Sequence, residues 1–257
     1  MIRESGDLPQ SYSRPIGHLR KIRRRGGLKG KNMHIEPGIV HGAKMALAVA
    51  TAAGCGAYAA KLAWEDLKSS NIASFAARVG LAAIGTFIFF EVLPHFAVGI
   101  SEVHFILGTT LFLLLGAAPA AIGLALGLAV QGAVFAPSDM PMYFVNVTTL
   151  LVPLFAISEL AKRVLPQDKA YVDLAYSDVL KLSFVYQGGV VAWVAFWAFY
   201  GQGVTSGTMT SVLSFGGAYM LVVLVEPIAD LAVLAGAKTL RGLEKTGLVA
   251  DRLYRAA

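Results

Sequence analysis

The residues best suited to chemistry in this sequence are a methionine and a histidine at positions 33 and 34, where a basic N-terminal stretch gives way to apolar segments. If Met33 is the first residue of the mature chain, its α-amine and the backbone nitrogen and imidazole Nδ1 of His34 can chelate one metal ion. A second histidine would complete a planar set of four nitrogens, which suits Ni(II), Cu(II) or Co(II) better than Mg or Ca. The alternative interpretation is that His34 is an interfacial residue ahead of a helix.

The composition of the chain is that of a membrane protein. Hydrophobic residues make up 56% of it and charged residues 15%, with a mean hydropathy of +0.63, whereas soluble domains carry about 25% charged residues. The one cysteine, Cys55, lies in an apolar segment, which excludes a disulfide framework and a thiolate metal cluster. The positive charge lies in the leader, short loops and tail, so nucleic acid is not an expected partner.

Seven apolar segments are long enough, or nearly so, to cross about 30 Å of hydrocarbon, which takes about 20 helical residues. They lie near residues 39–63, 73–93, 102–116, 118–136, 142–161, 180–200 and 209–236. The sequence therefore predicts an all-α fold, a polytopic membrane helix bundle of about seven transmembrane helices in a lipid bilayer.

Lysine and arginine are distributed unevenly among the connections between these segments. The second, fourth and sixth connections contain none, and twelve of the 13 basic residues after residue 32 lie on the opposite side; Lys44 is the exception. The positive-inside rule makes the basic side cytoplasmic. We therefore expect the N-terminus outside and the C-terminus in the cytoplasm.

Residues 1–32 form a basic leader that conflicts with this topology. The leader contains nine of the 22 Lys and Arg and has no apolar h-region, so it is not a secretory signal peptide. It could be a cytoplasmic tail, a targeting segment or the product of a start codon assigned too early. Residues 29–32, Lys-Gly-Lys-Asn, require purine-rich codons where a bacterial ribosome-binding site would lie. Because exporting nine positive charges opposes the rule, we expect the mature transmembrane domain to be residues 33–257.

Polar residues inside the predicted spans are costly and are candidate functional residues. One cluster lies at the outer end of the second and third spans and comprises Glu91, His95, Ser101, Glu102 and His104. The outer half of the fifth span adds Asn146, Thr148 and Thr149, and the fourth span contains Gln131. For Glu226 and Asp230, near the cytoplasmic half of the last span, capping or pairing with Lys238 or Arg241 is the favoured interpretation.

Small residues recur along the first span at a spacing that lets helices approach closely. The predicted face comprises Ala46, Ala50, Gly54 and Ala57. Such a face serves either packing within the bundle or docking of another membrane subunit.

Three motifs carry a resemblance to a known family. Residues 33–38, Met-His-Ile-Glu-Pro-Gly, look like the Met-His-Ile-x-x-Gly start of the CbiM/NikM family, the substrate-capture components of energy-coupling-factor ABC transporters for cobalt and nickel. Residues 99–108 resemble the Gly/Ser-rich segment of that family that ends in His and an apolar-Gly run, and residues 145–153 resemble its later Asn-containing helix. Together the motifs cover the chain from Met33 onward.

The resemblance implies a metal site made by the Met33 amine, the backbone nitrogen and imidazole of His34, and the imidazole of His104. Co(II) or Ni(II) is then the transported substrate, and no cofactor is expected. Glu102 would orient His104 or attract cations. The remaining candidates near the metal or its access route are Ser101, His95, His41 and Asn146.

The resemblance also implies partners. They are a transmembrane coupling (T) subunit, ABC ATPase subunits and, as a further candidate, a small accessory membrane subunit. The location is the bacterial cytoplasmic (inner) membrane, and the metal would supply cobalamin synthesis or a nickel enzyme. The residues do not separate cobalt from nickel.

The chain carries no motif of its own for ATP hydrolysis or other catalysis. It lacks Gly-x-x-x-x-Gly-Lys-Ser/Thr, as well as Ser-His-Asp and His-Glu-x-x-His arrangements, so a transporter component rather than an enzyme is expected. The competing hypothesis is a self-sufficient secondary permease for a divalent metal, which predicts charged residues near the bilayer midplane and internal symmetry. A membrane-intrinsic metalloenzyme is the third possibility.

Overall fold

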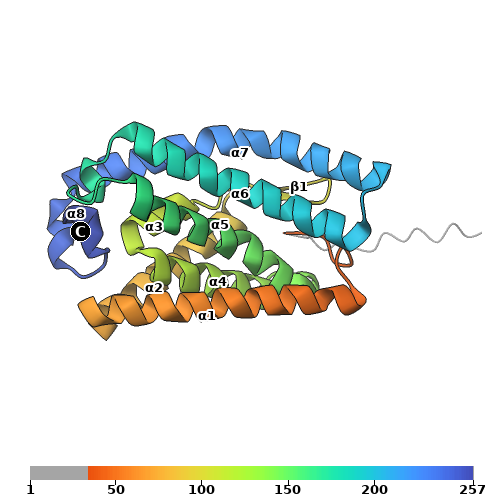
Figure 1. Cartoon of the computed structure of the whole chain (residues 1–257), viewed down its shortest axis with the longest axis horizontal. Coiled ribbons are helices and arrows are strands. Elements are labelled where there is room, and N and C mark those ends of the chain that lie inside the picture. The colour runs from red at the N-terminus through yellow and green to blue at the C-terminus, as the bar shows by residue number, and fades with distance from the viewer. Residues whose placement is uncertain (1–33, 257) are drawn as a thin grey trace, which may run out of the picture.

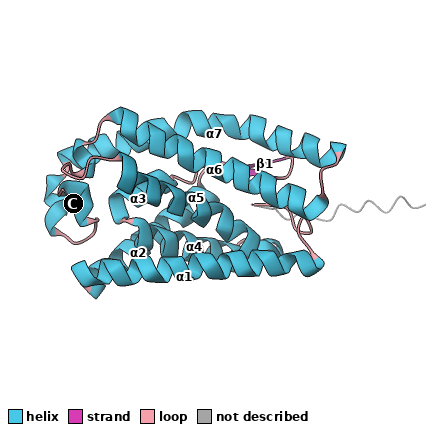
Figure 2. Ribbon diagram, viewed as in Figure 1, coloured by secondary structure: helices cyan, strands magenta, loops and turns pink. Residues whose placement is uncertain are grey.

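The structure is a computed structural model that describes residues 34–256, and almost all of its regular structure is helical (Figures 1 and 2). The α-helices are α1 Met45–Ser69, α2 Ile72–Phe87, α3 Gly108–Leu115, α4 Ala117–Val134, α5 Tyr143–Val164, α6 Tyr176–Gln202, α7 Ser206–Thr239 and α8 Asp251–Tyr254. A two-residue turn joins the antiparallel strands β1 Phe96–Val98 and β2 Ser101–Val103. Five shorter helical turns are η1 Gly42–Lys44, η2 Ile88–Val92, η3 Pro137–Met142, η4 Tyr171–Asp173 and η5 Arg241–Lys245.

Six helices within the described residues are long and apolar enough to cross a membrane. They cover Gly42–Ser69, Ile72–Val92, Ala117–Val134, Pro137–Val164, Tyr176–Gln202 and Ser206–Thr239. The predicted all-α polytopic bundle is confirmed. The described chain begins at one end of the bundle and its C-terminal helix α8 lies at the other (Figure 1). These are called the His34 end and the α8 end below.

The third predicted span, residues 102–116, is not one continuous helix. It consists of β2, an irregular segment and the short helix α3. It still crosses the bundle, because Ile100 O accepts a hydrogen bond from Glu36 N (3.4 Å) at the His34 end and Leu114 O accepts one from Ala250 N (2.7 Å) at the α8 end. Backbone groups that leave a helix at membrane depth must find partners within the protein. Here the partners are carboxylates of α7.

Those carboxylates belong to Glu226 and Asp230. The interpretation that they pair with Lys238 or Arg241 is wrong for the described residues. Both cap the N-terminal side of α3. Neither forms an ion pair with Lys238 or Arg241 among the described residues: the Lys238 ammonium lies over the Tyr176 ring, and Arg241 pairs with Asp173.

Glycines set the close packing of α4 against α2. A Cβ added at Gly123 would lie 2.2 Å from the Ala82 Cβ, and one added at Gly127 would lie 2.6 Å from the Thr86 Cβ. These glycines are four residues apart and so lie on one face of α4. The two helices can approach this closely only because neither position carries a side chain.

The small residues of α1 behave differently. Ala46, Ala50, Gly54 and Ala57 are exposed on the surface of the bundle, and a Cβ added at Gly54 would meet nothing within 4 Å. The face that α1 buries comprises Ala48, Cys55, Ala59 and Leu62, and α1 packs on α4 and α5. The predicted face is therefore not used for packing within the described chain.

The N-terminal loop, residues 34–44, precedes α1, which begins at Met45 rather than near residue 39 as predicted. The Ile39 N–H donates to Glu36 O (3.2 Å) across Pro37-Gly38, and Gly38 has φ +91°, as the third position of a type II turn requires. The Lys44 ammonium donates to Gly201 O (2.8 Å) near the end of α6. This bond places a cation at a helix C-terminus, where it is favourable.

An ion pair of the buried Arg78 with the half-buried Asp66 lies at the α8 end. Arg78 is 3% exposed and donates to Asp66 through two hydrogen bonds of 2.9 and 2.5 Å and to Leu115 O at 2.9 Å. The last bond satisfies a carbonyl at the C-terminal end of α3.

Candidate functional site

Two histidines that are 70 residues apart in the sequence meet inside the His34 end of the bundle. His34 is 5% exposed and His104 is 7% exposed, and their ring centroids lie 5.4 Å apart at an angle of 70°. Phe90, fully buried in the π-helical turn η2, packs edge-on against both imidazoles, with centroid distances of 5.3 Å to His34 and 4.6 Å to His104. The bundle therefore brings together the two imidazoles predicted to share a metal.

The hydrogen bonds of these imidazoles leave nitrogens available for ligation. His104 Nδ1 lies 3.1 Å from Phe105 O, and because a carbonyl only accepts, Nδ1 carries the proton and Nε2 keeps its lone pair. Neither ring nitrogen of His34 has a hydrogen-bond partner within the described part of the chain. Buried polar atoms without partners are costly, so a ligand that uses them gains an advantage.

The backbone next to His34 is held by α5. Ile35 N donates to Asn146 Oδ1 at 3.2 Å in a buried hydrogen bond. Thr149, one turn along the same helix, is 5% exposed and lines the cavity beside His34. Asn146, predicted as a candidate near the metal, thus fixes the N-terminal loop one residue after His34.

A small cavity lies between the two histidines and the helices α5, α6 and α7. Its lining comprises His34, Ile35, Ser101, Glu102, His104, Ile106, Asn146, Thr149, Leu150, Val190, Val194, Phe215 and Tyr219. Ser101 (8% exposed) and Glu102 (5% exposed) come from β2. The structure therefore places these two predicted residues beside the histidines.

The remaining predicted residues among those described do not line this cavity. His95 is half-buried next to β1, and its Nδ1 lies 3.1 Å from Leu93 O. His41 is exposed where the N-terminal loop meets η1. Neither lines the cavity between the histidines. Met33 lies outside the described residues.

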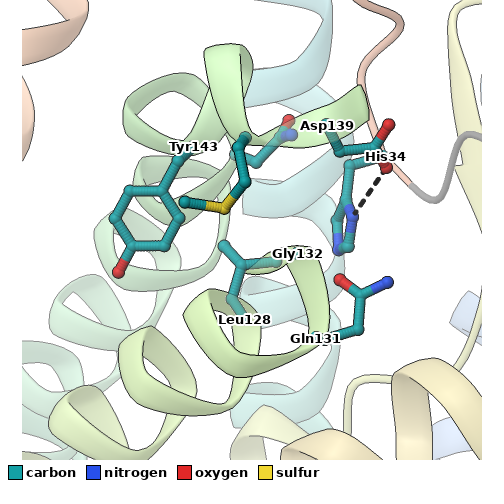
Figure 3. Close-up of a pocket in the computed structure, with 8 residues that line it drawn as sticks. His34, Leu128, Gln131, Gly132, Asp139 and Tyr143 are labelled. Atoms are coloured by element: carbon teal, nitrogen blue, oxygen red, sulfur yellow. Dashed lines mark ion pairs between the residues drawn. The ribbon is translucent and has the colours of Figure 1, made fainter. Parts of the chain in front are cut away.

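Three residues near the histidines were not assigned to this site from the sequence. Asp139 in η3 is 4% exposed, and its Oδ2 lies 4.0 Å from His34 Nδ1 (Figure 3). Figure 3 also shows the fully buried Gln131 amide on the other side of the His34 ring. Phe90 is the third. The only feature of the sequence that could have indicated Asp139 as a site residue is its charge, because the connection around residues 137–141 is otherwise uncharged.

Comparison with known proteins identifies the family. The family model described as cobalt uptake substrate-specific transmembrane region, CbiM, matches residues 34–242. The chain belongs to the CbiM family. Neither the curated proteins nor the solved structures provide a match. The resemblance inferred from the motifs is confirmed, and the chain is a multi-pass membrane protein of cobalt transport.

Membership of the CbiM family gives cobalt as the expected substrate. Among residues 34–256, no group of three or more His, Cys, Asp or Glu side chains lies close enough to hold a metal ion. Within the CbiM match, His34 and His104 are the two imidazoles that meet in the bundle interior.

Proposed function

We propose that this chain captures Co(II) or Ni(II) at a site formed by His34 and His104, as the substrate-binding component of an energy-coupling-factor ABC transporter. The observation that carries the proposal is the meeting of the two buried imidazoles, with centroids 5.4 Å apart. Imidazole nitrogens suit Co(II) and Ni(II), whereas Mg and Ca prefer oxygen ligands.

The proposed donor set has four nitrogens. His104 contributes Nε2, His34 contributes its backbone nitrogen and Nδ1, and the α-amine of Met33 is the fourth. The proposal therefore requires that the mature protein begins at Met33.

Two buried carboxylates favour a cation at this place. Asp139 lies 4.0 Å from His34 Nδ1, and Glu102 lines the cavity between the histidines. A negative charge near a buried metal lowers the electrostatic cost of removing the ion from water. Glu102 and Asp139 would therefore assist capture without direct ligation.

The energy for uptake would come from separate subunits, because the sequence has no phosphate-binding loop of its own. The exposed face of Ala46, Ala50, Gly54 and Ala57 supports docking of a transmembrane coupling subunit. ABC ATPase subunits, and a small accessory membrane subunit, would complete the complex. The imported metal would serve cobalamin synthesis or a nickel enzyme.

Metal binding by the purified protein tests the proposal. Calorimetric titration with Co(II) and with Ni(II) should give one high-affinity site per chain, which His34→Ala and His104→Ala each abolish. His95→Ala is the matched control, because it also removes an imidazole but His95 does not line the cavity. This variant should bind Co(II) and Ni(II) as the unaltered protein does. Stoichiometric tight binding by His104→Ala would contradict the assignment.

One observation favours the secondary permease as the second candidate. Glu226 and Asp230 are acidic groups buried inside the bundle, at 0% and 2% exposure, as that hypothesis predicts. Their oxygens, however, accept hydrogen bonds from the backbone around α3. Metal uptake by the chain alone in liposomes, without ATP or partner subunits, would favour the permease; uptake that needs the partners supports the transporter complex.

A further inference from the structure

The longest helix, α7, carries two carboxylates that the proposed capture site does not use. Glu226 and Asp230 are four residues apart and lie on one face of α7. They are 0% and 2% exposed. No ion pair joins either of them to a basic side chain within the described residues.

Both carboxylates accept hydrogen bonds from the segment that follows His104. Glu226 Oε1 accepts from Ile106 N and from Leu107 N (2.9 Å). Asp230 Oδ1 accepts from both the backbone N–H (3.1 Å) and the hydroxyl (2.5 Å) of Thr110. Ser183 of α6 donates its hydroxyl to the other oxygen of Asp230 at 2.6 Å.

The segment after His104 needs such acceptors because its backbone is irregular. Leu107 has φ +53°, an uncommon left-handed conformation for a residue with a side chain. The next residue, Gly108, lies so close to the Tyr186 ring that an added Cβ would be 2.1 Å from it. The first N–H groups of a helix also have no partner inside that helix. Inside a bilayer, these groups depend on side chains for their hydrogen bonds.

We propose that Glu226 and Asp230 are positioning residues for the metal site, which fix residues 106–110 and thereby aim the His104 imidazole at His34. The bonds to Glu226 begin two residues after His104, so little free chain separates the fixed backbone from the ligand. The inference rests on the proposed role of His104 in metal binding. It assigns the carboxylates the role of hydrogen-bond acceptors, for which their negative charge is not required.

Amide and apolar replacements separate the role of an acceptor from that of a charge. Glu226→Gln keeps an acceptor oxygen, whereas Glu226→Leu has a similar size and keeps none. With Co(II) as the probe and the full protein purified in detergent, we expect Glu226→Leu to raise the Kd at least tenfold and to change the optical spectrum of bound Co(II). We expect Glu226→Gln to stay within about threefold of the unaltered protein, because its carbonyl oxygen can accept the same bonds.

Amide hydrogen exchange of the metal-free protein gives a readout that does not depend on metal. In Glu226→Leu the amides of residues 106–110 should exchange faster, and in Glu226→Gln they should remain protected. Asp66→Leu is the matched control: it removes the half-buried ion-pair partner of the buried Arg78 at the α8 end. It should lower stability while leaving the Co(II) affinity and the exchange of residues 106–110 unchanged.

These experiments distinguish a failure of the proposed metal-binding function from a failure of the positioning role. If the unaltered protein binds no Co(II) or Ni(II), the proposed function fails, and hydrogen exchange still tests the backbone contacts. If it binds and Glu226→Leu binds equally well with unchanged exchange, the positioning role is overturned. Equal losses in Glu226→Gln and Glu226→Leu would also overturn it, because charge would then be required. If Glu226→Leu does not fold, Thr110→Val, which removes the hydroxyl bond to Asp230, must still speed exchange at residues 106–110.

Discussion

The hydrogen bond between the N-terminal loop and α5 should be important for metal affinity. Ile35 N donates to Asn146 Oδ1 at 3.2 Å, and Asn146 is 2% exposed. Asn146→Leu keeps the approximate size of the side chain but leaves a buried N–H without its acceptor. Such a loss costs about 1–3 kcal/mol, which corresponds to an increase of about 5-fold to about 150-fold in Kd if it falls on the metal-bound state.

Calorimetric titration of the purified protein with Co(II) measures this change. Asn146→Asp retains an acceptor oxygen and should bind much more tightly than Asn146→Leu. Ser158→Ala is the matched control, because Ser158 is also a buried polar residue of α5 (3% exposed) but lies twelve residues further along the helix. It should bind as the unaltered protein does.

Two results would refute the reasoning about Asn146. The first is an unchanged Kd in a folded Asn146→Leu protein, which would mean that the loop holds His34 in place without this bond. The second is a loss in Asn146→Asp as large as that in Asn146→Leu, which would show that the acceptor is not the feature that matters. Helical content and the thermal unfolding midpoint, measured alongside, verify that each variant folds.

Further predictions concern packing and the start of the chain. Gly123→Leu should lower the free energy of unfolding by about 1–3 kcal/mol, because a Cβ there would lie 2.2 Å from Ala82 Cβ; wild-type thermal stability would contradict this. Gly54→Leu, on the exposed face of α1, should keep stability and metal binding but reduce uptake in cells that contain the coupling subunit, so undiminished uptake would remove this face from the docking proposal. Intact-mass measurement should show that the native protein begins at Met33. A chain that keeps residues 1–32 should bind Co(II) poorly. Tight binding by a native protein that includes residues 1–32 would refute the Met33 amine as a ligand.

The sequence predicted the long helices well because apolar length alone defines them. Residues 142–161 and 180–200 were predicted as spans, and the structure has α5 at Tyr143–Val164 and α6 at Tyr176–Gln202. The first span was placed about six residues too early. Its start is set by the Pro37-Gly38 turn and by contacts of the N-terminal loop with α6, which include the bond from Lys44 to Gly201 O. A hydropathy profile contains no information on contacts between residues that are far apart in the sequence.

The irregular backbone of the segment after His104 could not be predicted from sequence patterns for a similar reason. Apolar residues with small polar ones suit a membrane helix as well as an irregular segment buried among helices. The choice between them depends on one acceptor oxygen of Glu226, which lies 120 residues after Ile106 and 119 after Leu107 in the sequence. Asp139 was likewise missed, because only the fold brings it to 4.0 Å from His34.

The two proposed imidazole ligands are held by different helices. Asn146 of α5 fixes the backbone next to His34, while Glu226 of α7 fixes the backbone just after His104. Phe90 of η2 packs against both rings. A ligand held in its bound position before the metal arrives loses less conformational entropy on binding, so more of the interaction energy remains as affinity. On the proposed function, Asn146→Leu and Glu226→Leu should therefore each lower affinity through a different ligand, even though neither residue belongs to the proposed set of donors.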